Sequence, residues 1–100
     1  MLNQVVLVGR ITKDVVLSTT KSNKKVTTIT IACPRNYKNS EGTYDTDFIP
    51  VILWEEIASN VEKYCKKGDI VGIKGRLINE NNEIKFIAEK VTFLSSNNKD

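Results

Sequence analysis

The stretch Thr46-Asp-Phe-Ile-Pro-Val-Ile-Leu-Trp54 decides how the fold of this chain is interpreted. Its β-branched and aromatic residues predict a β-strand. Side chains alternate between the two faces of a strand, so Phe48 and Trp54, six residues apart, point to the same face. Such rings either belong to a core or form a platform on which nucleic-acid bases stack. The choice between these two interpretations decides the function.

The opposite face of this strand offers an adequate core without the rings. Ile49, Val51 and Leu53 alternate with the aromatic residues and would fill one buried face. A barrel buries one face of each strand, and surplus apolar area on the other face marks an interaction surface. We therefore expect Phe48 and Trp54 to lie outside the core. The residues alone leave core packing of the rings open.

The length and the charge distribution narrow the classes of partner. One hundred residues with 40% hydrophobic and 27% charged side chains predict one globular domain. The net charge is +3, but residues 1–40 carry seven basic residues against one acidic residue. Residues 41–100 carry eight basic and eleven acidic residues. This asymmetry favours an anionic partner that binds mainly through the first half of the chain.

Other features indicate a cytoplasmic protein without a metal or cofactor. No apolar run approaches the roughly 20 residues that span a bilayer, and the first residues lack the features of a signal peptide. Cys33 and Cys65 cannot supply four zinc ligands in a chain without histidine. We expect two free, mostly buried thiols, with a disulfide between them as the alternative.

Periodicity predicts a helix between the third and fourth of five strands. Residues Glu55–Lys67 place Ile57, Val61 and Tyr64 on one apolar stripe, and Gly68 is expected to end the helix. This element order is that of the OB-fold, a mainly β, five-stranded, partly open Greek-key barrel. Other small barrels and α+β folds share the order. The expected strands are Gln4–Thr12 with a continuation at Val15–Thr19, Val26–Cys33, Phe48–Trp54, Asp69–Asn79 and Ile84–Leu94.

Two segments carry further side chains for a site. Asn36–Asp45 has a hairpin-loop composition. In the strand Asp69–Asn79, Val71, Ile73 and Leu77 would face the core, and the basic residues Lys74 and Arg76 would face outward.

Several motifs follow one another along most of the chain. The opening is Met1-Leu-Asn-Gln-Val-Val-Leu-Val-Gly-Arg-Ile-Thr-Lys-Asp14, followed by Ile29-Thr-Ile-Ala32, Arg35-Asn-Tyr37, Asp47 through Trp54, Tyr64-Cys-Lys-Lys-Gly-Asp69, Gly75-Arg-Leu77 and Glu89-Lys-Val-Thr-Phe-Leu94. Each motif is unspecific alone. Together and in this order, they resemble bacterial and phage single-stranded DNA-binding proteins over roughly residues 1–94.

This resemblance implies an OB-fold domain over residues 1–95, with 96–100 as a frayed end. It implies non-enzymatic binding and protection of single-stranded DNA with little sequence preference, in replication, recombination or repair. Single-stranded RNA would bind more weakly. The family assembles as homotetramers, so a homo-oligomer is expected here. The residues that match the nucleic-acid-binding positions are the stacking rings Tyr37, Phe48 and Trp54 and the basic residues Arg10, Arg35, Lys38, Lys74 and Arg76.

Three departures from the family pattern affect these expectations. The turn Glu80–Asn82 is short and carries no ring, which predicts a smaller site or weaker binding. The sequence ends without the family's glycine-rich linker and acidic tip, so it gives no support for tail-mediated partners. A short accessory form and a trimmed core both fit that ending. Val15 and Ser18 replace residues that are often Pro and Arg in relatives, which weakens a DNA-contacting role there.

Two rival functions follow from the residues. Asp45 and Asp47 could share a metal ion in a hydrolase, but no His or Cys joins them and such pairs are more often solvated. We therefore expect no enzymatic activity. The stronger alternative is an OB-fold protein-interaction or primosome-type adaptor with weak nucleic-acid binding.

Overall fold

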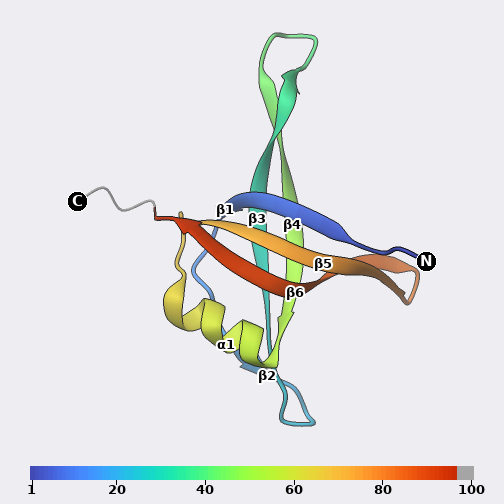
Figure 1. Cartoon of the computed structure of the whole chain (residues 1–100), viewed down its shortest axis with the longest axis vertical. Coiled ribbons are helices and arrows are strands. Elements are labelled where there is room, and N and C mark those ends of the chain that lie inside the picture. The colour runs from blue at the N-terminus through green and yellow to red at the C-terminus, as the bar shows by residue number, and fades with distance from the viewer. Residues whose placement is uncertain (97–100) are drawn as a thin grey trace.

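Strands from both halves of the chain form one sheet that closes into a barrel (Figure 1). The computed structural model describes residues 1–96. The strand order is β1-β5-β6-β4-β3-β2, and pairing of β1 with β3 closes the sheet. The predicted OB-fold arrangement, with a helix between the third and fourth long strands, is confirmed. The elements are β1 (Val5–Ile11), β2 (Ser18–Thr19), β3 (Lys25–Lys38), β4 (Tyr44–Trp54), α1 (Glu55–Tyr64), β5 (Ile70–Glu80) and β6 (Glu83–Ser95).

The core forms where the inner faces of the strands meet α1. Ile31, Val51 and Leu53 are completely buried, and Ala58 and Val61 of α1 close one end of the barrel. The predicted inner face of β4 is therefore confirmed. The remaining members of the buried cluster are Ile11, Ile29, Val71, Ile73, Phe86 and Ala88.

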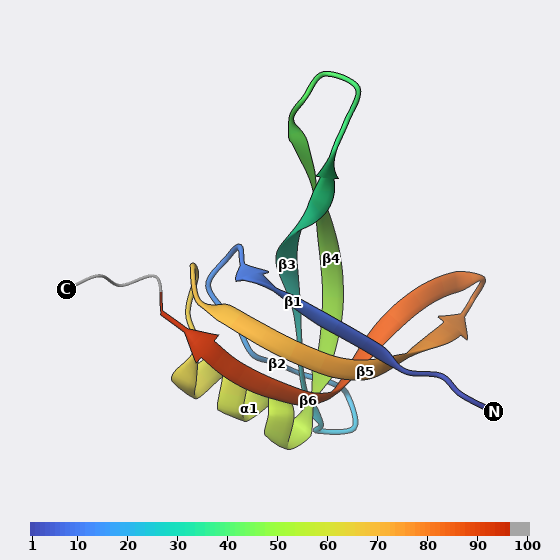
Figure 2. The same ribbon diagram turned by 45° about the horizontal axis from the view of Figure 1, so that its top comes forward.

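The two strands of the β3–β4 hairpin extend well beyond the barrel as a twisted arm (Figures 1 and 2). Half of the expected loop Asn36–Asp45 is strand, because Asn39 organises a tighter turn. Its backbone N–H donates to the carbonyl of Thr43 at 2.7 Å. Its side-chain Oδ1 accepts from the backbone N–H groups of Glu41 at 2.9 Å and Thr43 at 3.1 Å. Gly42, with φ of 83°, supplies the left-handed residue of this turn.

The second hairpin, β5–β6, leaves the barrel at a bulge. The pairing register of β5 and β6 shifts between Lys74 and Gly75. A side chain at Gly75 would collide with the backbone of Ile87 and with the ring of Phe86, so glycine permits this close approach. Beyond the bulge, Leu77 is 40% exposed. The expectation that Leu77 belongs to the core was wrong, because β5 has already left the barrel wall there.

The helix is shorter than its periodicity predicts. It ends at Tyr64, and Cys65 is extended, with φ of −120°. Gly68, with φ of 95°, shapes the following turn and donates its N–H to the carbonyl of Ile11 at 2.8 Å. Tyr64 was expected to pack on the barrel, yet its side chain is exposed and the Lys63 ammonium lies 5.3 Å from its ring centroid.

No helix within residues 1–96 is long and apolar enough to cross a membrane. Residues 97–100, which make up most of the expected frayed end, lie outside the described residues.

Candidate functional site

The outer face of β4 carries an exposed row of apolar side chains. Phe48 is 64% exposed and Trp54 39% exposed, so both rings lie outside the core. Strand geometry separates them by about 20 Å, with Pro50 and Ile52 between them on the same face. The choice between core and surface is thereby settled: these rings are surface side chains.

The arm carries two further exposed rings, of which Tyr44 shares the face of Phe48 on β4. Tyr37 on β3 and Tyr44 on β4 are both more than half exposed. Lys38 pairs with Tyr44 across the two strands, and its ammonium lies 5.9 Å from the ring centroid. Tyr44 lies within the expected loop Asn36–Asp45 and was not among the predicted stacking rings. Its exposure follows from the length of the strands, which the loop-like composition of this segment conceals.

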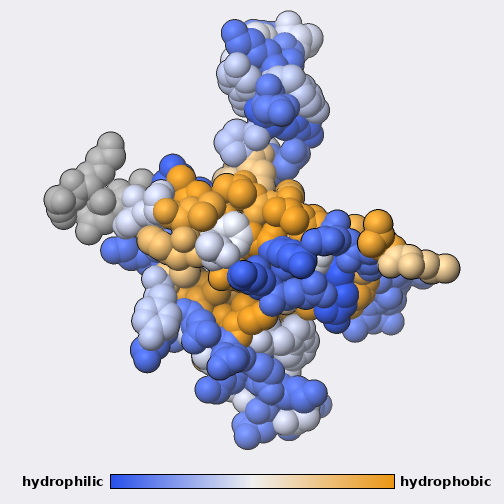
Figure 3. Space-filling model, viewed as in Figure 1, coloured by the Kyte–Doolittle hydropathy of each residue, from blue (hydrophilic) through white to orange (hydrophobic). Residues whose placement is uncertain are grey.

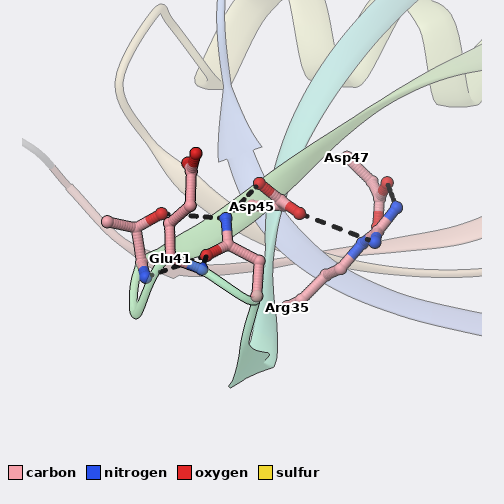
Figure 4. Close-up of polar contacts among 6 residues, drawn as sticks. Arg35, Glu41, Asp45 and Asp47 are labelled. Atoms are coloured by element: carbon pink, nitrogen blue, oxygen red, sulfur yellow. Dashed lines mark hydrogen bonds and ion pairs between the residues drawn. The ribbon is translucent and has the colours of Figure 1, made fainter.

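The guanidinium of Arg35 forms ion pairs with two carboxylates of β4. Its Nε and Nη2 donate to Asp47 Oδ2 at 3.0 Å and to Asp47 Oδ1 at 2.9 Å, a two-pronged contact. Asp45 lies 3.8 Å from Nη1 of the same guanidinium (Figure 4). The hydrogen bond from Arg35 lowers the pKa of Asp47, and the same bond raises the pKa of Arg35. The arm therefore holds its own arginine between carboxylates.

The other predicted basic residues lie on β1 and β5. Arg10 pairs with Ala32, which in turn pairs with Phe48, so Arg10 lies two strands from that ring on the same face of the sheet. Arg10 donates from Nη1 to the carbonyl of Gly68 at 2.7 Å and so ties β1 to the turn before β5. Arg76 pairs with Glu89 at 3.2 Å, and Lys74 lies opposite Lys90. In the sheet order β6 separates β5 from β4, so the basic residues of β5 occupy a different wall of the barrel.

The carboxylates of the arm are engaged with Arg35. Asp45 and Asp47 both turn toward Arg35, and the described residues contain no group of three or more potential metal-binding side chains.

Cys33 and Cys65 are free thiols, though only partly buried. Burial raises the pKa of both thiols, and neighbouring carboxylates add to the effect. Neither thiol is an activated nucleophile.

Of the predicted site residues, the structure gathers five on the β3–β4 hairpin and places three elsewhere. The five are Arg35, Tyr37, Lys38, Phe48 and Trp54, and the three are Arg10, Lys74 and Arg76.

The solved structure of the wild-type single-stranded DNA-binding protein from Thermus aquaticus is similar to this barrel. It superposes with a TM-score of 0.75 at 27% identity, over 99% of this chain and 43% of that chain.

Curated relatives show the same likeness in sequence. A single-stranded DNA-binding protein of Streptococcus mutans is 46% identical over 83% of this chain and 51% of its own length. Single-stranded DNA-binding protein 3 of Streptococcus agalactiae is 40% identical over 98% of this chain and 78% of its own. This chain thus spans about half the length of the first of these relatives. The model of the single-strand binding protein family matches residues 2–93, and the chain belongs to that family.

Proposed function

We propose that this protein binds single-stranded DNA with little sequence preference and protects it without catalysing a reaction. The observation that carries the proposal is the exposure of Phe48 and Trp54 on one face of β4, in a barrel of the single-strand binding family. Every base has a π-face, so stacking on such rings tolerates any sequence. Each stacked base contributes roughly 1–3 kcal/mol.

Basic side chains supply the salt-dependent part of binding. Lys38 lies beside the rings, whereas Arg35 is engaged by Asp47 and Asp45. Because each neutralised phosphate of a single strand contributes about −0.7 to the slope of log K against log salt, few phosphate contacts on the arm give a shallow slope. Stacking is therefore the larger contribution at this site.

Titration of a labelled oligo-dT, followed by anisotropy at several salt concentrations, tests the proposal. We expect saturable binding that weakens with salt, with little competition from duplex DNA and weaker competition from single-stranded RNA. If RNA of equal length competed better than DNA, the assigned substrate would be wrong. Weak oligo-dT binding that is unchanged by Phe48→Ala and by Trp54→Ala would favour the adaptor function instead.

Assembly into a homo-oligomer, which the family resemblance implies is a tetramer, is supported by the surface of β1. Pairing with β3 covers only Arg10 and Ile11, which leaves the earlier part of β1 without a partner on that edge among the described residues. Val6 and Val8 are 65% and 55% exposed there. Figure 3 shows hydrophobic side chains gathered where β1 crosses the barrel. An exposed edge with apolar side chains is a template for pairing with a second copy.

Mass by light scattering, with and without oligo-dT, tests the assembly. We expect four copies, and Val8→Lys should lower the mass. A monomeric mass for the unmodified protein at micromolar concentration would contradict this part of the proposal.

A further inference from the structure

Glu55, at the junction of β4 and α1, has a backbone conformation that its side chain disfavours. Its φ is 53°, in the left-handed region, which costs free energy for most L-residues and which glycine and asparagine tolerate best. Within residues 1–96, the other non-glycine residues with positive φ are Asn23, Asn81 and Asn82. Strain of this kind persists only where surrounding contacts fix it, and such residues cluster at functional sites. The contacts of Glu55 must therefore offset this cost.

The side chain of Glu55 extends the pairing of β3 with β4 by one step. Trp54 is the last residue of β4 and pairs with Val26 of β3. The next pair along this ladder would set residue 55 opposite residue 25. Oε1 of Glu55 accepts a hydrogen bond from the backbone N–H of Lys25 at 2.8 Å. The carboxylate thus binds the backbone donor of the residue that Glu55 would face if the strand continued.

This contact fixes the backbone on the downstream side of Trp54. On the upstream side, Leu53 is completely buried and pairs with Thr27. On the downstream side, α1 begins at Glu55 with no connecting residue (Figure 1). The side chain of Trp54 forms no capping hydrogen bond to the helix, and it is 39% exposed. The orientation of this ring therefore depends on the backbone that flanks it.

We propose that Glu55 is a positioning residue, which holds Trp54 in the orientation that stacks a base by tying the start of α1 to the backbone of β3. The inference rests on the proposed function, since it concerns how a stacking ring is presented. A carboxylate repels phosphates, so Glu55 acts through Trp54 and not by contact with the strand. A ring that samples other orientations binds with an affinity reduced to the fraction that is competent.

The charge of Glu55 has a second effect, which a neighbour separates from the first. Glu55 and Glu56 both lie in the first turn of α1, where negative charge is favourable. Among the described residues, the left-handed φ and the hydrogen bond to β3 belong to Glu55 and not to Glu56. Glu56→Ala is therefore the control for the loss of charge from this turn.

The fluorescence of Trp54 measures the mobility of the ring, because it is the single tryptophan of the chain. Glu55→Ala removes the hydrogen bond to Lys25. In the DNA-free variant, the anisotropy of Trp54 should fall and quenching by acrylamide should become stronger. The affinity for oligo-dT should fall roughly 2- to 12-fold, the contribution of one hydrogen bond. Glu55→Gln keeps a side-chain oxygen that can accept the same bond, so it should match the unmodified protein.

Glu55→Gly separates the positioning of Trp54 from the stability of the fold. Glycine adopts the left-handed conformation freely, so the midpoint of urea unfolding should lie above that of Glu55→Ala. The anisotropy of Trp54 and the affinity for oligo-dT should nevertheless stay low, because the hydrogen bond is still absent. Glu56→Ala should lower neither of them. If Glu55→Ala did not fold, the comparison of Glu55→Gln with Glu55→Gly would test the same contact.

Several results with these variants would overturn the inference alone. Unchanged anisotropy and acrylamide quenching in Glu55→Ala would show that the contact does not hold the ring. A more mobile ring with undiminished affinity would show that its orientation does not matter for binding. Affinity that recovered with stability in Glu55→Gly would make the role of Glu55 structural, and equal losses in Glu55→Gln and Glu55→Ala would assign the effect to charge. If the unmodified protein did not bind oligo-dT, the proposed function would be wrong, and this inference with it.

Discussion

The two long hairpins of the barrel, β3–β4 and β5–β6, differ in the chemistry that they present. The first carries exposed rings, with Arg35 held between carboxylates. The second carries the aliphatic residues Leu77 and Ile84 and a surface ion pair, and none of its exposed large side chains near the turn is aromatic. Both leave regular pairing at a register shift, near Pro34 in one and at Gly75 in the other. The same architectural device therefore serves an aromatic arm, β3–β4, and an aliphatic arm, β5–β6.

The largest expected effect is the loss of oligo-dT affinity when a ring of the aromatic arm is removed. Phe48→Ala and Trp54→Ala should each weaken oligo-dT binding by about 1–3 kcal/mol, roughly 5- to 150-fold, because one stacked base is lost. Equilibrium anisotropy titration measures this loss. Tyr64→Ala removes a ring that is at least as exposed as Phe48 and Trp54 but lies on α1, so it is the control. An equal loss in Tyr64→Ala would show that exposed rings act non-specifically.

The next effect concerns how the aliphatic arm leaves the barrel. Gly75→Ala should lower the free energy of unfolding by about 1–3 kcal/mol, because the added methyl group collides with Ile87 and Phe86. Urea denaturation measures the change. In Gly72→Ala the new Cβ would meet Leu94 at 3.6 Å, an ordinary contact, so that variant should lose clearly less stability. Equal losses in both variants would remove the special role of the bulge.

A smaller effect is expected on the salt dependence of DNA binding, which reports the ion pairs of the β3–β4 arm. Asp47→Asn breaks the ion pair with Arg35, so the guanidinium becomes available to a phosphate. The slope of log K against log salt should become steeper by about 0.7, and affinity at low salt should rise. Glu41→Gln removes the same charge from the turn of the arm, outside the ion pairs of Arg35 with Asp45 and Asp47, and should change the slope less.

Acidification is a poor substitute for the Asp47→Asn variant. Since Arg35 lowers the pKa of Asp47, this carboxylate stays charged until the pH falls below its ordinary range near 3.9. Binding that strengthened between pH 6 and pH 5 would therefore point to a group other than Asp47.

The smallest expected effect is a change in the pKa of Cys33, which the carboxylate of Asp47 in the aromatic arm influences. Burial raises the pKa of Cys33, and the charge of Asp47 raises it further. Asp47→Asn should therefore move the midpoint of Cys33 alkylation to lower pH, measured in a Cys65→Ser background. Cys65, whose carboxylate neighbour is Asp69, is the internal control in a Cys33→Ser background. A shift of equal size at both thiols would mean that the substitution acts on the whole fold.

The inner and outer faces of the strands were predictable because alternation needs only local order. Val51 and Leu53 are buried and Phe48 is exposed, as a period of two requires. Leu77 lies on the same side of β5 as the buried Val71 and Ile73, yet it is outside the core. Alternation along a strand does not show where that strand leaves the barrel. That departure depends on the close approach of Gly75 to Ile87 and Phe86 of the paired strand β6, at the shift in register.

The part of the candidate site that lies on one strand, the face of β4 with its rings, could be predicted from alternation along that strand. The rings of β4 lie outside the core as expected. Which basic residues lie near them depends on how the strands pair. Arg35 faces Asp47 only through the register of β3 with β4, which sets residues 33 and 47 opposite each other. Lys74 and Arg76 face outward as expected, yet β6 lies between their strand β5 and the strand β4 that carries the rings. Strand order is a property of the whole sheet, and one strand's pattern does not carry it.

The central claim is that bases stack on the exposed outer face of β4, and the fluorescence of Trp54 tests it most directly. Trp54 is the single tryptophan of the chain, so its emission has one source. During titration with oligo-dT, we expect strong quenching that saturates at the same ratio as the anisotropy of a labelled strand. In Phe48→Ala the quenching should persist at higher oligonucleotide concentration. Unchanged emission while the anisotropy reports full binding would contradict stacking on Trp54.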